Sequence, residues 1–382
     1  MNIIIAPDSF KGSCSAREAA EYIGRGVRAV FPDAALTLLP IADGGEGTVE
    51  AICAAANGRL ISVDTLDPLN RPIAAQYGVL PDGTAVVEAA AASGLTLVKP
   101  DERDAMRASS YGTGLLMRHA LGNGAKKIIL GLGGTATTDG GMGIGRALGI
   151  SFLDAVGAPL GDGGEELLRL DKIDASGLMP EARECQFILA CDVKNTLCGA
   201  EGAAHVFAPQ KGADAQQVRT LDAALARYAQ VLAELGSDAA ARPSSGAAGG
   251  IGCLFMAFLS AVIKPGIELV LDTIGFDDHV RGADMVITGE GRLDAQSAYG
   301  KVPCGVAQRT KAVKSVPVIA IGGAIADGAD KLYDCGVDAL VSSVDRITTL
   351  ADAMNNAEKN LTAATARAMQ LIKAGMTMKA GK

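Results

Sequence analysis

The chain has 382 residues, of which 49% are hydrophobic and 20% are charged, and its formal net charge is −8. This length exceeds what one hydrophobic core usually supports, so we expect a globular protein of two domains. The net charge is acidic, no long basic run is present and tryptophan is absent, so we expect no nucleic-acid partner.

The N-terminus and the cysteines indicate the compartment in which the protein works. The first eight residues, Met-Asn-Ile-Ile-Ile-Ala-Pro-Asp, lack the basic segment and the long apolar segment of a signal peptide. The longest apolar stretch, residues 251–263, is shorter than the ~20 residues that span a bilayer. The eight cysteines form no CxxC pair. We therefore expect a cytoplasmic protein with reduced cysteines and no membrane contact.

The N-terminal part of the chain alternates between predicted strands and helices. Residues 3–6 form a short apolar strand. A helix is expected over residues 16–31, because Ser15 and Glu18 make a capping box and apolar residues recur on one face. A second strand is expected over residues 36–41, followed by another helix. This order predicts a parallel sheet.

The C-terminal hundred residues repeat the alternation, whereas the middle of the chain differs. The C-terminal strands are expected over residues 285–288, 316–321 and 339–342, with helices near 303–313 and 329–333 and a final helix after them. In the middle, a hairpin is expected to join residues 73–80 to residues 84–88. We therefore expect an α/β fold with one domain built from residues 1–70 and 283–382. The second domain, residues 71–282, is inserted into the first.

Three glycine-rich segments follow predicted strands, at residues 42–48, 131–141 and 288–294. Glycine lets backbone amides approach phosphate oxygens, and a helix N-terminus adds partial positive charge. One such segment alone could equally be a tight turn, but three that carry acids or hydroxyls favour a polyphosphate and metal site. The residues expected to bind nucleotide phosphates are Gly133, Gly134, Thr135, Thr138, Gly289 and Gly291.

The segment from Gly131 to Ala136 also fits the dinucleotide-binding fingerprint. That fingerprint includes an acidic residue about 20 positions farther along the chain, and Asp154 would be that residue. The following run, residues 137–141, would have to start the phosphate-binding helix, yet it is poor in helix formers. An NAD(P)-dependent oxidoreductase that uses this loop is therefore the alternative enzyme. The chain contains no P-loop and no protein-kinase signature.

Acids and cations gather where predicted strands end, which is where open α/β sheets bind ligands. The acids are Asp8, Asp43, Glu46, Asp139, Asp192, Glu290 and Asp294, and the cations are Lys11, Lys211, Arg292 and Lys301. Phosphoryl transfer needs carboxylates to hold Mg²⁺ and cations to neutralise the moving phosphate. A lone loop acid is more often a solvated residue or a helix cap. Among these acids, Asp192 is the favoured candidate for a functional role, because it directly follows an apolar strand.

Seven segments carry a resemblance to a known family. They are Ile-Ala-Pro-Asp8-Ser9-Phe10-Lys11-Gly-Ser, Pro-Ile-Ala-Asp43-Gly-Gly-Glu46-Gly-Thr48, Gly-Leu-Gly-Gly-Thr135-Ala-Thr-Thr138-Asp139-Gly-Gly, Ala-Cys-Asp192-Val-Lys-Asn195, Ala-Pro-Gln-Lys211-Gly-Ala, Gly-Ala-Ala-Gly-Gly and Ile-Thr-Gly-Glu290-Gly-Arg292-Leu-Asp294. In order and spacing they resemble bacterial glycerate kinases of the first type, from residue 1 to about residue 350. Small departures occur at Gly12, where an acidic residue is common, and at Thr196, where proline is usual.

The resemblance implies both a fold and an activity. The fold would be a flavodoxin-like parallel-sheet domain built from both chain ends, with a second α/β domain inserted into it and the active site between them. The activity would be transfer of the γ-phosphoryl group of ATP to D-glycerate with Mg²⁺, giving 2-phosphoglycerate. A non-enzymatic protein that binds a small acid is the second alternative, and a homodimer is one assembly to test.

Residue chemistry then suggests individual roles. Catalysis is assigned to Asp192, Lys11 and Arg292, substrate binding to Asp8, Ser9, Asn195 and Lys211, and Mg²⁺ binding to Asp43, Glu290 and Asp294. Asp192 would orient or deprotonate the glycerate hydroxyl group. The cations would neutralise the transferred phosphate and hold the glycerate carboxylate, and the sequence does not rank them.

Overall fold

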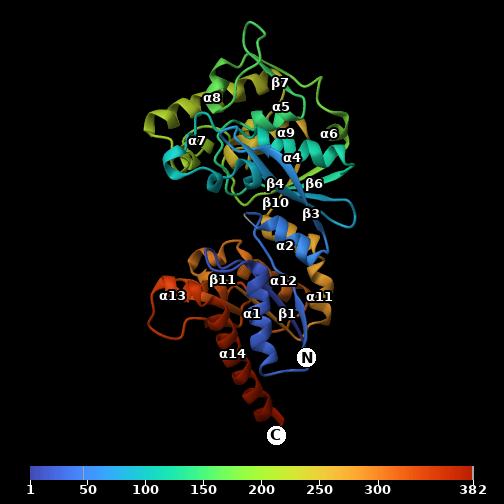
Figure 1. Ribbon diagram of the computed structural model, residues 1–382, viewed down its shortest axis with the longest axis vertical. Helices are drawn as coiled ribbons and strands as arrows, with labels where there is room; N and C mark the ends of the chain where they lie inside the picture. Colours follow the sequence, from blue (N-terminus) through green and yellow to red (C-terminus); the bar gives the residue numbers. More distant parts are fainter. Residues whose placement is uncertain (46, 381–382) are drawn as a thin grey trace. The chain divides into compact units, whose positions relative to one another are not determined.

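The computed structural model describes residues 1–45 and 47–380. The chain forms two compact units (Figure 1). The first unit consists of residues 1–43, 50–57 and those from 267 onward, and the second of residues 44–49 and 58–266. Each unit contains a β-sheet with helices, so the predicted α/β fold class is confirmed.

Parallel strands form the sheet of the first unit. They are β1 (Asn2–Pro7), β2 (Ala35–Leu38), β11 (Met285–Leu293), β12 (Val318–Ile325) and β13 (Ala339–Ser342). The spatial order is β13-β12-β11-β1-β2, so β1 from the start of the chain pairs with β11 from its end. Numbered along the chain within this unit, the order is 2-1-3-4-5, which is the flavodoxin-like order. The expected flavodoxin-like sheet from both chain ends is confirmed.

Helices surround the sheet of the first unit, and α1 (Ala16–Arg28) packs on it through an apolar face. The helices are α1, most of α2 (Thr48–Ala55), α10 (Gly266–Thr273), α11 (Phe276–Gly282), α12 (Val302–Val313), α13 (Leu350–Asn355) and α14 (Ala357–Ala380), with the 3₁₀ turns η6 (Ala295–Ala298) and η7 (Ala329–Leu332). The predicted capping box of α1 is present, because the Ser15 side chain accepts from the Glu18 N–H and the Glu18 side chain accepts from the Ser15 N–H. Ile23 and Val27 of α1 are fully buried against the sheet core.

Two cysteines of the first unit are joined, contrary to the expectation of reduced cysteines throughout. Cys304 on α12 and Cys335 after η7 form a disulfide bond, with their Cα atoms 5.3 Å apart. The two residues are 31 positions apart in the chain and share no sequence motif, so only the folded sheet brings them together. The free cysteines are Cys14, Cys53, Cys185, Cys191, Cys198 and Cys253.

The second unit is built on a mixed sheet. Its strands are β3 (Arg59–Leu66), β4 (Pro72–Val79), β5 (Ala85–Glu88), β6 (Lys127–Gly131), β9 (Gln186–Ala190) and β10 (Val262–Lys264), in the order β10-β9-β6-β5-β4-β3. A separate ribbon pairs β7 (Ser151–Leu153) with β8 (Lys172–Asp174). Strands β4 and β5 are antiparallel, so the predicted hairpin is confirmed, whereas β5, β6, β9 and β10 run parallel.

Helices and large aromatic side chains complete the second unit. The helices are α3 (Ala90–Ser93), α4 (Tyr111–Gly122), α5 (Met142–Ala147), α6 (Pro180–Glu184), α7 (Ala203–Phe207), α8 (Ala215–Glu234) and α9 (Ala247–Phe258), with the 3₁₀ turns η1 (Leu95–Leu97), η2 (Pro100–Glu102), η3 (Gly164–Arg169), η4 (Pro209–Lys211) and η5 (Ala239–Ala241). Phe187 on β9 meets Phe255 on α9 edge to face, with ring centroids 5.3 Å apart. Such pairs add to the area buried in the core.

The boundaries between the units differ from the predicted ones at residues 70 and 283. Strand β3 pairs with β4 along its whole length, so residues from 58 onward belong to the second unit. Helices α10 and α11 belong to the first unit, which therefore resumes at residue 267. Independent movement of two domains stays a prediction.

Among the described residues, every helix is too short or too polar to cross a bilayer.

Candidate functional site

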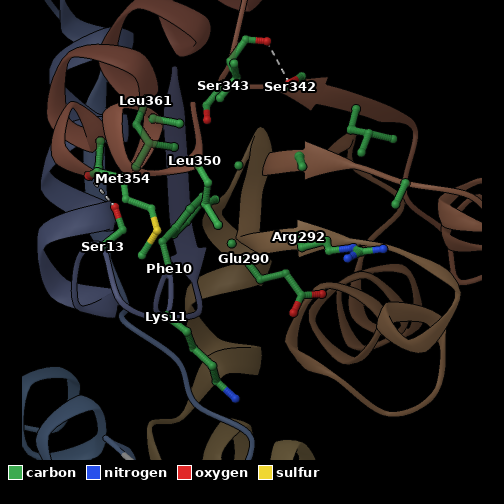
Figure 2. Close-up of a pocket in the computed structure, with 18 of the residues that line it drawn as sticks. Phe10, Lys11, Ser13, Glu290, Arg292, Ser342, Ser343, Leu350, Met354 and Leu361 are labelled. Atoms are coloured by element: carbon green, nitrogen blue, oxygen red, sulfur yellow. Dashed lines mark hydrogen bonds between the residues drawn. The ribbon is translucent and has the colours of Figure 1, made fainter. Parts of the chain in front are cut away.

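A pocket of about 870 Å³ opens in the first unit where β1, β11, β12 and β13 end (Figure 2). The strand order reverses between β1 and β11, and this is the point where flavodoxin-like sheets bind ligands. The charged lining residues are Asp8, Lys11, Glu290, Arg292, Asp294 and Lys301, and the larger apolar ones are Phe10, Ile325, Val344, Leu350, Met354 and Leu361. The pocket therefore has a charged part and an apolar part.

Asp8 and Glu290 are the buried acids of this pocket. The backbone N–H of Asp8, directly after β1, donates to the carbonyl of Gly289 at 2.8 Å. Burial, together with the nearby charges of Asp43 and Glu290, raises the pKa of Asp8 to about 7. Burial also raises the pKa of Glu290. Carboxylates in such an environment gain stability in their ionised form when a cation binds beside them.

Phosphoryl transfer, the chemistry expected from the sequence, would require Mg²⁺. The surroundings of the Glu290 carboxylate show whether this pocket could bind such an ion. Its Oε1 atom is buried and has no hydrogen-bond partner among the described residues. No cluster of three or more His, Cys, Asp or Glu at metal-ligand spacing occurs in residues 1–45 and 47–380. Mg²⁺ usually takes only one or two protein carboxylates together with substrate phosphates and water. Glu290, with Asp8 or Asp43 beside it, fits that pattern.

Asp294 has partners on both carboxylate oxygens. Its Oδ1 atom accepts from the Gln296 N–H at 2.8 Å and thereby caps η6. Its Oδ2 atom lies 3.4 Å from Nε of Arg292. These contacts favour a helix cap over the metal-ligand role suggested by the sequence, because both oxygens are already engaged.

The cations of the pocket differ in exposure. Lys11 is exposed, and the Arg292 side chain is 69% exposed, so both can reach an anionic ligand. Lys301 is less exposed, and its Nζ atom lies 3.9 Å from Oε2 of Glu290. The sequence placed Lys301 in a suitable loop but gave it no role. Ser9, beside Lys11, is half-buried, and its N–H donates to Oδ1 of Asp8.

The glycines of β11 have a packing reason as well as a proposed phosphate role. A Cβ atom on Gly289 would lie 2.2 Å from the carbonyl oxygen of Ile321 on β12, so any larger residue would force these strands apart. Gly291 differs, because the nearest atoms to an added Cβ belong to Phe10 and Lys11 at 3.4 Å or more. Close strand packing explains Gly289, whereas Gly291 leaves room beside the pocket.

In the second unit, Asp139 organises the glycine-rich segment between β6 and α5. Its fully buried carboxylate accepts from Ser110 N at 2.8 Å, Ser110 Oγ at 2.7 Å, Gly141 N at 3.1 Å and Gly143 N at 3.2 Å. Burial raises its pKa in spite of these four donors. Gly134 in the same segment has a φ of +74°, which favours glycine. The carboxylate thus holds this loop in one conformation.

Lys211, the last residue of η4, contacts this glycine-rich segment and is almost inaccessible to solvent. It is 3% exposed, and its Nζ atom donates to the carbonyl of Thr137 at 2.5 Å and approaches Oγ1 of Thr135 at 3.5 Å. Burial lowers the pKa of Lys211 to about 8, against the attraction of Asp139. Oγ1 of Thr138 is buried with no hydrogen-bond partner among the described residues. The substrate contact suggested for Lys211 stays a prediction, and its observed contacts show that it positions the loop.

The lowered pKa of Lys211 predicts a pH-dependent stability. Burying the protonated amine costs free energy, and this cost falls away as pH rises from about 8 toward the ordinary value of 10.5. Between pH 7 and pH 9.5, we expect the free energy of unfolding of the wild type to rise by about 2 kcal/mol relative to Lys211→Met. Urea denaturation at both pH values measures it. Parallel pH dependences in the two proteins would show that Lys211 is not buried in its charged form.

Asp192 and Asn195 follow β9 in the second unit. Asp192 is exposed, and its Oδ1 atom accepts from the Gly266 N–H at 3.0 Å. Asn195 donates through Nδ2 to the carbonyl of Glu201 at 2.7 Å, and its own carbonyl accepts from Gly246 N at 3.0 Å. Asp192 therefore stands at a strand end as predicted, with its carboxylate accessible. Asn195 stabilises the loop, and its substrate contact stays a prediction.

The dinucleotide alternative fails on local structure. The fingerprint needs a helix that begins within the glycine run, so that its N-terminus meets the pyrophosphate. Here α5 begins only at Met142, six residues after Ala136, and residues between them are not helical. The interpretation of Gly131–Ala136 as an NAD(P) loop is therefore wrong.

The structure places the predicted site residues in two groups. The first unit holds Asp8, Ser9, Lys11, Asp43, Gly289, Glu290, Gly291, Arg292 and Asp294. The second unit holds Gly133, Gly134, Thr135, Thr138, Asp192, Asn195 and Lys211. Glu46, one of the candidate acids, lies outside the described residues. Sequence reasoning missed the apolar pocket lining, including Leu350 and Met354, because apolar residues on a helix also suit a core.

Comparisons with known proteins agree on one family. The model of the glycerate kinase family matches residues 3–373. The chain is 47% identical to a glycerate kinase of Bacillus subtilis over 94% of each chain. It is 45% identical to a glycerate 2-kinase of Escherichia coli K12, over 98% of this chain and 99% of that one. A crystal structure assigned as glycerate kinase 2 from Salmonella typhimurium LT2 covers 99% of each chain with a TM-score of 0.89 and 45% identity.

Proposed function

The chain belongs to the glycerate kinase family, and on that premise we propose that it transfers the γ-phosphoryl group of ATP to the 2-hydroxyl group of D-glycerate. The near-complete match to the family, over residues 3–373, carries this proposal. The pocket of the first unit supports it, because acids and cations stand together at a ligand-binding switch point. The names of the relatives favour a kinase over a protein that only binds a small acid.

The proposed roles follow from the chemistry of the described residues. Glu290, with Asp8 or Asp43, would hold Mg²⁺. When bound, the ion would neutralise negative charge on the donor phosphates. Lys11 and Arg292 are exposed cations that can neutralise the equatorial oxygens of the transferred group. Asp192 would orient the acceptor hydroxyl group or take its proton.

The identity of the product tests the proposed position of transfer. In an assay coupled through enolase, pyruvate kinase and lactate dehydrogenase, without phosphoglycerate mutase, a 2-phosphate product is expected to consume NADH. NADH consumption that begins only after mutase is added would show that the 3-hydroxyl group is the acceptor.

Omitting Mg²⁺ from the kinase step, with the product assayed afterwards in complete coupling mix, is expected to abolish turnover.

A thermal-shift screen separates the competing functions before any kinetics. A ligand at 100 times its dissociation constant stabilises a protein by about 2.7 kcal/mol. We expect MgATP to stabilise the chain and NADP not to do so, and the opposite result would overturn the proposal. Stabilisation by D-glycerate without turnover would instead support the binding protein. We also propose a cytoplasmic location and a homodimer, which fractionation and light scattering test.

A further inference from the structure

The pocket of the first unit is larger and more apolar than a three-carbon acid requires. Its volume of about 870 Å³ lies in the range of ~300–1,000 Å³ that is typical of sites for larger organic ligands. All three carbon atoms of glycerate carry oxygen, so glycerate offers little surface to the side chains of Phe10, Leu350 and Met354. The pocket fits a ligand that has an anionic end and a larger, weakly polar end.

The apolar part is held in place by hydrogen bonds between two segments. In the segment after β1, the Phe10 N–H donates to the carbonyl of Cys14 at 2.9 Å. From the same loop, Oγ of Ser13 donates to the carbonyl of Met354 on α13 at 2.8 Å (Figure 2). Because these contacts join the loop to α13, they hold the apolar wall in place, which lowers the cost of ordering it on binding.

The apolar wall is also exposed to a degree that a core would not tolerate. Leu350 is 76% exposed and Ile325 is 42% exposed, yet both line the pocket. Figure 2 shows Leu350, Met354 and Phe10 gathered on one side, with Glu290 and Arg292 on the other. A ligand that covers the exposed apolar atoms removes them from water, which favours binding.

We propose that the apolar part of this pocket binds the nucleobase of the phosphoryl donor, against Phe10, Leu350 and Met354. The phosphates of the donor then lie toward Lys11, Lys301 and Glu290. This inference rests on the proposed kinase function and adds the place where the donor is recognised. On this proposal, contacts to the base contribute binding free energy that a triphosphate without a base lacks.

Two variants and one matched control test the base site by calorimetry with MgATP and with magnesium tripolyphosphate. Leu350→Gln makes the wall polar at an exposed position, and Ala353→Phe fills the pocket from α13. The control is Leu371→Gln on α14, because Leu371 is also 76% exposed but does not line the pocket. The KM values for ATP and for glycerate are measured in parallel, and thermal melting checks that each variant is folded.

We expect the Kd for MgATP to rise about fivefold in Leu350→Gln and more than tenfold in Ala353→Phe. The Kd for tripolyphosphate in Leu350→Gln, the KM for glycerate in both variants and every value for Leu371→Gln should stay within twofold of the wild type. If the folded variants bind MgATP with the wild-type Kd, and the wild type phosphorylates glycerate, the base site is wrong but the proposed function stands. Wild-type protein that neither binds nor uses ATP would overturn the proposed function, and the base site with it.

Discussion

Replacing Asp192 with Asn is expected to lower the turnover number for D-glycerate by at least ~100-fold, the lower range for a general acid or base. Asp192 is exposed just beyond β9, at the carboxyl end of a strand, where open α/β sheets bind ligands. The amide oxygen of Asn can still accept from the Gly266 N–H, which Asp192 holds at 3.0 Å. The substitution therefore removes the charge while keeping the shape and this loop contact, and thermal melting checks that the variant is folded.

A titration with Mg²⁺ distinguishes the ways in which Asp192 could act. The transition state of phosphoryl transfer is loose and demands little of a base, so a large loss could also come from the metal or from substrate position. A metal ligand predicts a raised Mg²⁺ requirement and partial rescue at high concentration. An orienting group or base predicts an unchanged requirement. A folded Asp192→Asn variant within threefold of the wild-type turnover number would make Asp192 a structural residue.

The local features of the fold were predictable because they depend on neighbours in the chain. The Ser15 and Glu18 capping box and the hairpin between β4 and β5 are both determined by a few adjacent residues. Strand β11 was expected to end at residue 288, but it extends to Leu293. The glycines at 289 and 291 led us to predict a loop. Instead they lie within β11, and the neighbouring β12 backbone leaves no room for a side chain at Gly289.

Features that depend on distant contacts were not predictable in the same way. Strand β3 shows the pattern of a strand, but pairing with β4 decides the sheet to which it belongs. Cys304 and Cys335 meet only because the chain connections of the first unit place α12 beside η7. The carboxyl-end rule did locate Asp8 and Glu290, since parallel strands deliver their ends to one edge. No such rule identifies Leu350 as part of the pocket.

The buried carboxylate of Asp139 is expected to have the largest effect on stability. Asp139→Ala would leave four hydrogen-bond donors, two from Ser110 and one each from Gly141 and Gly143, without their acceptor in a fully buried site. It would also remove the negative charge that faces the buried Lys211. Breaking a buried charged network in this way costs ~3–5 kcal/mol. We expect the free energy of unfolding to fall by that amount.

Two further variants show whether the cost comes from the acceptor geometry of Asp139. In Asp139→Asn the amide oxygen can take the Oδ2 position and accept its three bonds, whereas the NH₂ group cannot accept from the Gly141 N–H, so we expect a smaller loss than with Ala. Asp238→Ala is the control, because that side chain is 71% exposed and pairs with Arg242 on the surface. A surface pair of this kind contributes about 0–1 kcal/mol. Urea denaturation at pH 7 compares the three variants, and an Asp139→Ala loss no larger than that of the control would show that the loop conformation does not depend on this carboxylate.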